Sequence, residues 1–116
     1  MTVEARVKAA LDVFGGPVEK SVLAAAAKRH PSRYYTFSCD SFGANYGDDE
    51  PGCERCLAHI HLFAPLNQDC FRQIRDTKRA LFRAGFTWPE VADATDQDGQ
   101  HFVFECETVQ PIEEDE

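Results

Sequence analysis

The sequence predicts an α+β domain with one N-terminal helix, possibly two, and a sheet of about four mostly antiparallel strands. Two segments, one at the N-terminus and one over 70–85, place apolar residues at helical three- and four-residue steps. Four other segments alternate in polarity, as half-buried strands do. Because these strands form two pairs, we expect two hairpins separated by one amphipathic helix.

The length of the chain limits it to one domain. With 116 residues, it can bury roughly two-thirds of the surface of its unfolded chain, enough for one sheet and a helix or two. Hydrophobic residues make up 43% and aromatic residues 11%, which is typical of a folded protein. We assign residues 1–110 to a single α+β domain and 111–116 to an acidic C-terminal tail.

A first helix is predicted directly after Thr2, whose hydroxyl can cap its N-terminus. Apolar residues recur at helical spacing, and Gly15-Gly16-Pro17 ends the helix. Residues 18–29 contain good helix formers, so we expect a second helix there. The apolar stripe of this second helix is mostly alanine, which buries little area.

The first hairpin is expected from two alternating segments, 34–40 and 56–64. Between them, residues 41–54 contain three Gly, one Pro and four acidic residues without a period, which predicts a long exposed loop. Both faces of 56–64 are half apolar. This strand is therefore central in the sheet, or its second face is covered by another element or subunit.

The clearest helix spans residues 70–85. Asn67 or Asp69 can cap its N-terminus, and Gly85 supplies the left-handed residue that ends it. A weaker strand follows over 88–95. Because this strand contains Pro89, it should begin irregularly or lie at a sheet edge.

The final strand is predicted over 101–109, where one row of alternate residues should point into the core. That row contains Phe102, Phe104 and Cys106, so Cys106 is interpreted as a core thiol rather than a nucleophile.

The connection before this strand, TDQDGQHFVFE, has acidic residues and a glycine at several positions of a calcium loop. Ala94, however, stands where the first carboxylate ligand is required, and strands rather than helices flank the segment. The Asp98-Gly99 pair between two alternating segments instead predicts a hairpin turn.

The charge balance argues against specific nucleic-acid binding. The chain has 20 acidic and 12 basic residues, a net charge of −8, and such a field repels phosphate. The strongest basic stripe lies on the predicted helix 70–85, and we interpret it as the solvated face of that helix. The stripe consists of Arg72, Arg75, Lys78, Arg79 and Arg83.

The N-terminal segment lacks a long apolar core and a small-residue cleavage pattern, so no signal peptide is predicted. No apolar run approaches the roughly 20 residues of a membrane span. We therefore expect a soluble protein made inside the cell, without a membrane partner. Five Cys without a secretion signal favour reduced thiols over disulfides.

A small metal-binding or thiol-dependent domain is the alternative function that the sequence raises. Such a domain would use four residues: Cys53, Cys56, His59 and His61. The two Cys have the spacing of half a zinc site. On a regular strand, however, Cys56 points away from the face that carries both His. A redox role would place the first Cys at a helix N-terminus, whereas a strand follows here.

No complete catalytic set is found in the sequence, which has no nucleophile elbow, phosphate-binding glycine loop or HExxH motif. We therefore expect no enzymatic activity, no cofactor and no metal. One face of the strand 56–64 nevertheless combines His with large apolar residues. These side chains are either partly buried and hydrogen-bonded or part of an intersubunit surface. The candidate subunit or partner interface is Leu57, His59, His61 and Phe63.

Four segments carry a resemblance to a known family. They are Tyr34-Tyr35-Thr36-Phe37, His61-Leu62-Phe63-Ala64-Pro65, Ala84-Gly85-Phe86-Thr87-Trp88-Pro89 and Asp98-Gly99-Gln100-His101-Phe102-Val103-Phe104-Glu105-Cys106-Glu107. With them the chain resembles small prophage and siphophage tail-completion or minor tail proteins, which are related in architecture to phage tail terminators. The resemblance covers about residues 34–107, and the first 33 residues match only as a leading helix. The CERC segment is a departure from the family pattern.

The resemblance implies a non-enzymatic virion assembly protein. Such proteins form rings, commonly six-fold, at the head-proximal end of the tail, where they stop tail-tube polymerisation and present a surface to the head connector. The implied partners are further copies of the chain, the tail tube and head-connector proteins. The implied location is the cytoplasm of the bacterial host during assembly, and then the virion tail.

Overall fold

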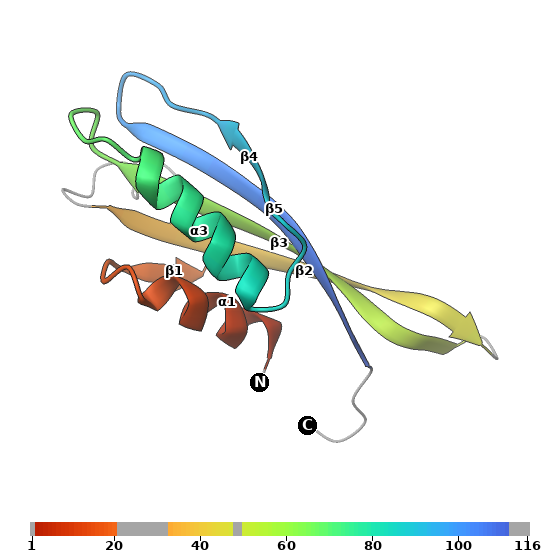
Figure 1. Cartoon of the computed structure of the whole chain (residues 1–116). Helices are drawn as coiled ribbons and strands as arrows, with labels where there is room; N and C mark the ends of the chain where they lie inside the picture. The colour runs from red at the N-terminus through yellow and green to blue at the C-terminus, as the bar shows by residue number, and fades with distance from the viewer. Residues whose placement is uncertain (1, 21–32, 48–49, 112–116) are drawn as a thin grey trace.

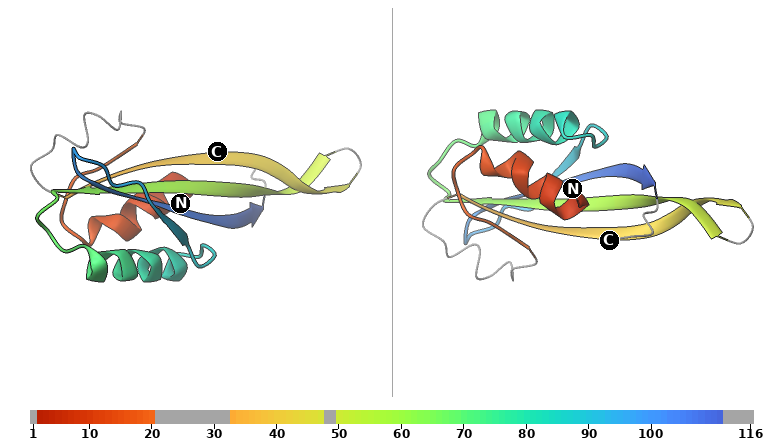
Figure 2. Two further views of the ribbon diagram at one scale, coloured as in Figure 1. Left: turned by 90° about the horizontal axis from the view of Figure 1, so that it is seen from above. Right: turned by 90° about the horizontal axis from the view of Figure 1, so that it is seen from below.

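The computed structural model describes residues 2–20, 33–47 and 50–111, with side chains described outside 42–52 and 110–111. Within these residues the chain is α+β, as predicted, with two helices packed on one face of a five-stranded mixed sheet (Figures 1 and 2). The strands are β1 (Val18–Lys20), β2 (Tyr34–Gly47), β3 (Glu50–Ala64), β4 (Glu90–Asp93) and β5 (Gln100–Pro111).

The strand order across the sheet is β1-β2-β3-β5-β4. β1 is parallel to β2, and every other neighbouring pair is antiparallel. The prediction of about four strands in two hairpins is therefore incomplete, because a short parallel strand extends the sheet beyond β2. β3 lies at the centre, as its two half-apolar faces indicate.

Helix α1 (Val3–Asp12) begins at Thr2, whose Oγ1 accepts a hydrogen bond from the Ala5 backbone N–H at 3.1 Å. The predicted cap is thus confirmed. The helix turns Val3, Val7 and Leu11 into the core.

The segment after α1 differs from the prediction of a helix over 18–29. Val18–Lys20 form β1, which pairs with Tyr35–Phe37, and Val18 is buried. The helical prediction is wrong for these three residues because a sheet edge offers them backbone partners and a core site for Val18, which outweigh weak local propensity. The rest of the predicted helix, 21–29, lies outside the described residues.

The prediction of a long loop over 41–54 is also wrong. β2 and β3 stay paired without a break in register from Tyr34↔Phe63 to Gly47↔Glu50. The ladder is formed by backbone groups, which Gly and acidic residues also have, so the low strand propensity of these residues does not exclude it.

Helix α3 (Phe71–Arg83) follows the predicted pattern and lies beside α1 on the sheet (Figure 2). Asp69 Oδ1 accepts from the Phe71 N–H at 2.9 Å at its start, and Gly85 follows its end with a φ of 101°. The Thr77 hydroxyl donates its one hydrogen to the Gln73 carbonyl at 2.6 Å. It must therefore accept the hydrogen bond from the Tyr35 hydroxyl, at 2.7 Å. This buried contact fixes α3 over β2.

The core lies between the helices and the sheet. Its fully buried centre is formed by alternate residues of the three longest strands and by Leu11 and Leu81 from the helices. The strand residues on this side include Tyr35, Phe37, Cys56, Ala58, Ile60, Leu62, Phe104 and Cys106.

The second antiparallel pair confirms two local predictions. β4 follows Pro89 and is an edge strand. The connection to β5 closes with two backbone hydrogen bonds between Asp96 and Gly99, of 3.1 and 3.3 Å. Asp96 Oδ1 also accepts from the Asp98 N–H at 2.9 Å. The segment is thus a hairpin turn rather than a calcium loop.

Replacing Gly85 with alanine is expected to lower the free energy of unfolding by about 1–2 kcal/mol, because a side chain is strained at its positive φ. An added Cβ would also lie 3.2 Å from Arg6 Nη1. Urea denaturation measures the loss. Gly15→Ala is the matched control, with a φ of 81° and no atom within 4 Å of the new Cβ. Equal losses in both variants would show that the Arg6 contact contributes nothing.

Candidate interaction surface

The sheet face opposite α1 and α3, here called the far face, carries all four residues of the predicted interface. Strand register arranges its side chains in rows across β2, β3 and β5. From one end to the other, the rows are Tyr34–Phe63–His101, Thr36–His61–Val103, Ser38–His59–Glu105 and Asp40–Leu57–Glu107.

Burial falls from the first row to the last. Tyr34, Phe63 and His101 are 7%, 2% and 8% exposed. In the last row, Asp40 is exposed and Leu57 is half-buried. The far face is therefore apolar and buried at one end and acidic and accessible at the other.

Two histidines join the buried end to the accessible part of the face. His61 Nδ1 and His101 Nε2 are 2.8 Å apart, so one ring donates a hydrogen bond and the other accepts it. The His101 ring stacks on Phe63 with a centroid separation of 4.3 Å and an interplanar angle of 21°. The accepting ring must be neutral, because a protonated imidazole has two donor nitrogens and no acceptor.

Burial lowers the pKa of His61 below its ordinary value of 6.5, and the charge of nearby His59 lowers it further. The folded chain therefore binds this proton more weakly than the unfolded chain. The contribution of His61 to the free energy of unfolding is complete above its pKa in the unfolded chain. It is lost as the pH falls through its pKa in the folded chain.

His61→Gln is expected to flatten the fall in the free energy of unfolding between about pH 8 and about pH 5, because glutamine does not titrate. Chemical denaturation at several pH values provides the measurement. His59→Gln is the control and should keep most of the slope, since burial is the larger cause of the His61 shift. An unchanged slope in the His61 variant would contradict a neutral His61 in the folded state.

The accessible end of the far face contains ion pairs. Arg55 Nη2 lies 2.8 Å from Glu107 Oε2, and His59 Nδ1 lies 3.5 Å from Glu105 Oε1. Both pairs are partly exposed, and the second is an ion pair only when His59 is protonated, so they contribute little to folding. They add polar groups around Leu57, as a rim does around an apolar contact.

The structure separates the four predicted interface residues into two groups. Leu57, His59 and His61 are half-buried and can contact a neighbour. Phe63 is buried between Tyr34 and His101, its partners across the strands. Sequence reasoning placed Phe63 on the correct face but did not identify Val103, which flanks His61 and is half-buried. The strand register would have identified it.

The four residues of the metal-binding alternative do not converge. β3 is regular through its register, so Cys53 shares a face with His59 and His61, while Cys56 faces the helices. Cys56 is fully buried, with its Sγ 3.3 Å from Ser41 Oγ. In the described ranges, no group of three or more His, Cys, Asp or Glu is placed to hold a metal ion.

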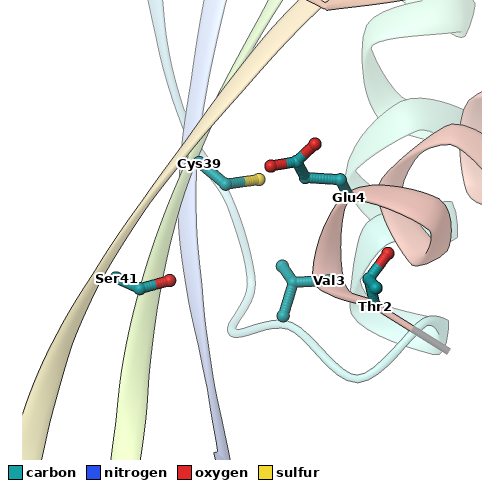
Figure 3. A pocket seen from close by; sticks show the side chains of 5 residues that line it. All are labelled: Thr2, Val3, Glu4, Cys39 and Ser41. Carbon is teal, nitrogen blue, oxygen red and sulfur yellow. The ribbon is translucent and has the colours of Figure 1, made fainter. Parts of the chain in front are cut away.

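A separate pocket of about 280 Å³ lies between the start of α1 and β2 (Figure 3). Cys39 and Ser41 of β2 line one side, opposite Val3 and Glu4 of α1. Burial, with the charge of Glu4 as the next cause, raises the pKa of Cys39 to about 11. Cys39 is therefore protonated and weakly nucleophilic near neutral pH, unlike a catalytic thiol.

Comparison with known proteins identifies no family. No protein-family model matches the chain, and no curated protein matches it significantly. Among the described helices, neither has the length and apolar character needed to cross a bilayer.

Proposed function

We propose that this chain is a non-enzymatic phage structural protein that acts in tail completion or head-tail joining, as a ring-forming subunit at the head-proximal end of the tail. The observation that carries the proposal is the far face, where Leu57, His59 and His61 stay partly accessible on a central strand. An antiparallel sheet commonly exposes one face to water, and that face is then polar. Here the accessible face carries Leu57 next to two histidines, and a neighbouring subunit would bury this apolar side chain. The four resembling segments favour the same function.

The shape of the chain suits a ring subunit. It measures 54 × 25 × 23 Å, and the paired ends of β2 and β3 project beyond both helices (Figure 1). In a closed ring with heterologous contacts, each subunit offers two different surfaces to its neighbours. A projecting hairpin reaches a neighbouring subunit without changing the packing of its own core.

The partners in this proposal are other copies of the chain, the tail tube and head-connector proteins. Assembly takes place in the cytoplasm of the bacterial host, and the ring then remains in the virion tail. A net charge of −8 per subunit lets DNA pass through the ring without binding it, because like charges repel.

Electron microscopy of the purified protein mixed with its cognate tail tubes tests the proposal. We expect rings at one end of each tube and no further tube growth. Leu57→Asp should prevent ring formation, because it adds a carboxylate beside Asp40 and Glu107, the register partners of Leu57. Val13→Asp is the control, since Val13 is 75% exposed on another part of the surface.

Three results would contradict the proposal: tubes without caps, rings unaffected by Leu57→Asp, or a gene located among housekeeping genes rather than beside tail and head-tail joining genes.

A zinc content near one atom per chain, measured by elemental analysis of protein purified without chelator, would favour the metal-binding alternative. The separation of Cys56 from the two His predicts a value near zero.

A further inference from the structure

The solvent-facing side of α3 combines cations with exposed aromatic residues. This α3 outer face consists of Phe71, Arg72, Arg75, Arg79, Phe82 and Arg83, all exposed. Phe71 is 75% exposed and Phe82 is 54% exposed, which is high for phenylalanine. Trp88 extends the surface, with its ring 5.6 Å from the Phe82 ring in an edge-to-face arrangement.

The cations of the α3 outer face have little charge compensation within the described residues. Arg72 lies 3.9 Å from Asp76, but its side chain is 87% exposed. No ion pair within 4.0 Å joins Arg75, Arg79 or Arg83 to a carboxylate of that part of the chain. A dense positive surface thus lies on a chain of net charge −8.

We propose that the α3 outer face binds the acidic C-terminal segment, residues 111–116, of a second copy of the chain. This inference rests on the proposed ring, in which every subunit has a neighbour. The segment reads Pro-Ile-Glu-Glu-Asp-Glu. Its four carboxylates match the cations, and its isoleucine provides an apolar contact for the phenylalanines.

The course of β5 favours contact between copies over contact within one chain. β5 runs past the C-terminal end of α3 and continues away from that helix (Figure 1). Its last residue, Pro111, pairs with Cys53 on β3. The acidic segment therefore starts beyond its own α3, on the side from which the hairpin projects.

Nucleic acid is the less favoured occupant of this surface. The remainder of the chain carries nearly all of the 20 acidic residues, and this field opposes a phosphate backbone. An acidic peptide of a second copy carries its charge on a short segment that can lie along the helix. Binding of a short duplex DNA by the α3 outer face, in place of the peptide, would overturn the proposal.

Fluorescence anisotropy with a labelled peptide of residues 107–116 tests the contact, with the chain truncated after residue 110 as receptor. We expect saturable binding that weakens about tenfold or more when salt rises from low to high ionic strength. Arg75→Glu/Arg79→Glu should abolish binding. Lys8→Glu/Lys20→Glu, with the same change in net charge on other exposed sites, should leave it intact.

Two variants with reversed charges, tested alone and mixed, provide a second test. Glu113→Lys/Glu114→Lys and Arg75→Glu/Arg79→Glu should each impair ring formation alone, and a mixture of the two variants should restore it. Restoration requires that the segment of one copy meets α3 of another. Failure of the mixture to restore rings, or absence of peptide binding, overturns the inference. If wild-type rings still cap tubes in that case, the proposed function stands without it.

Discussion

Replacing Phe104 with alanine is expected to lower the free energy of unfolding by about 3–5 kcal/mol. Phe104 is fully buried on β5, where it pairs with Ile60 of β3 and Val91 of β4 beneath the helices. Truncation removes buried apolar surface and leaves a cavity that two long strands and two helices cannot easily close. A domain of this size has a total stability of about 5–15 kcal/mol, so the loss is a large fraction of it.

Urea denaturation followed by circular dichroism measures this loss. Phe71→Ala is the matched control, because it removes the same atoms from a residue that is 75% exposed. Its free energy of unfolding should change by less than about 0.5 kcal/mol. Comparable losses in the two variants would contradict the placement of the core between the helices and the sheet.

Local signals in the sequence predicted several elements correctly because the physics that determines them is local. The Thr2 hydroxyl caps α1 through a residue three positions away. Gly85 ends α3 through its own backbone conformation, and the turn between Asp96 and Gly99 closes within four residues. In each case the interacting groups are neighbours in sequence.

The wrong predictions concern partners that are distant in sequence. β1 exists because Val18–Lys20 find the edge of β2, about seventeen residues further along the chain. The β2–β3 hairpin extends through Gly-rich and acidic segments because its ladder depends on backbone groups, which no composition reveals. Propensity ranks local preferences and does not identify these long-range partners.

The candidate surface was predictable only in part for the same reason. Alternation along 56–64 correctly placed Leu57, His59, His61 and Phe63 on one side of the sheet. Which side chains flank each of them depends on the pairing across the strands. Those neighbours follow from the register, which the sequence does not specify by itself. The sequence showed the α3 outer face as a basic stripe, but it did not show that Phe71 and Phe82 are exposed beside the cations.

Replacing Phe63 with alanine is expected to lower the free energy of unfolding by about 3–5 kcal/mol, although Phe63 lies on the face opposite the helices. It is 2% exposed, packs with Tyr34 and stacks on His101. Chemical denaturation measures the loss, and loss of the stacked ring should also weaken the contact between His61 and His101. The pH dependence of stability should then change along with its magnitude.

Leu57→Ala is the control, because Leu57 lies on the same face and strand but stays half-buried. Its free energy of unfolding should fall by less than about 1 kcal/mol, while ring formation on tail tubes should weaken. A folding role for Phe63 and an assembly role for Leu57 would thus divide the far face between its buried and accessible ends. If Phe63→Ala changed assembly and left stability intact, its ring would be a contact surface, and the burial gradient along the far face would not describe the chain in solution.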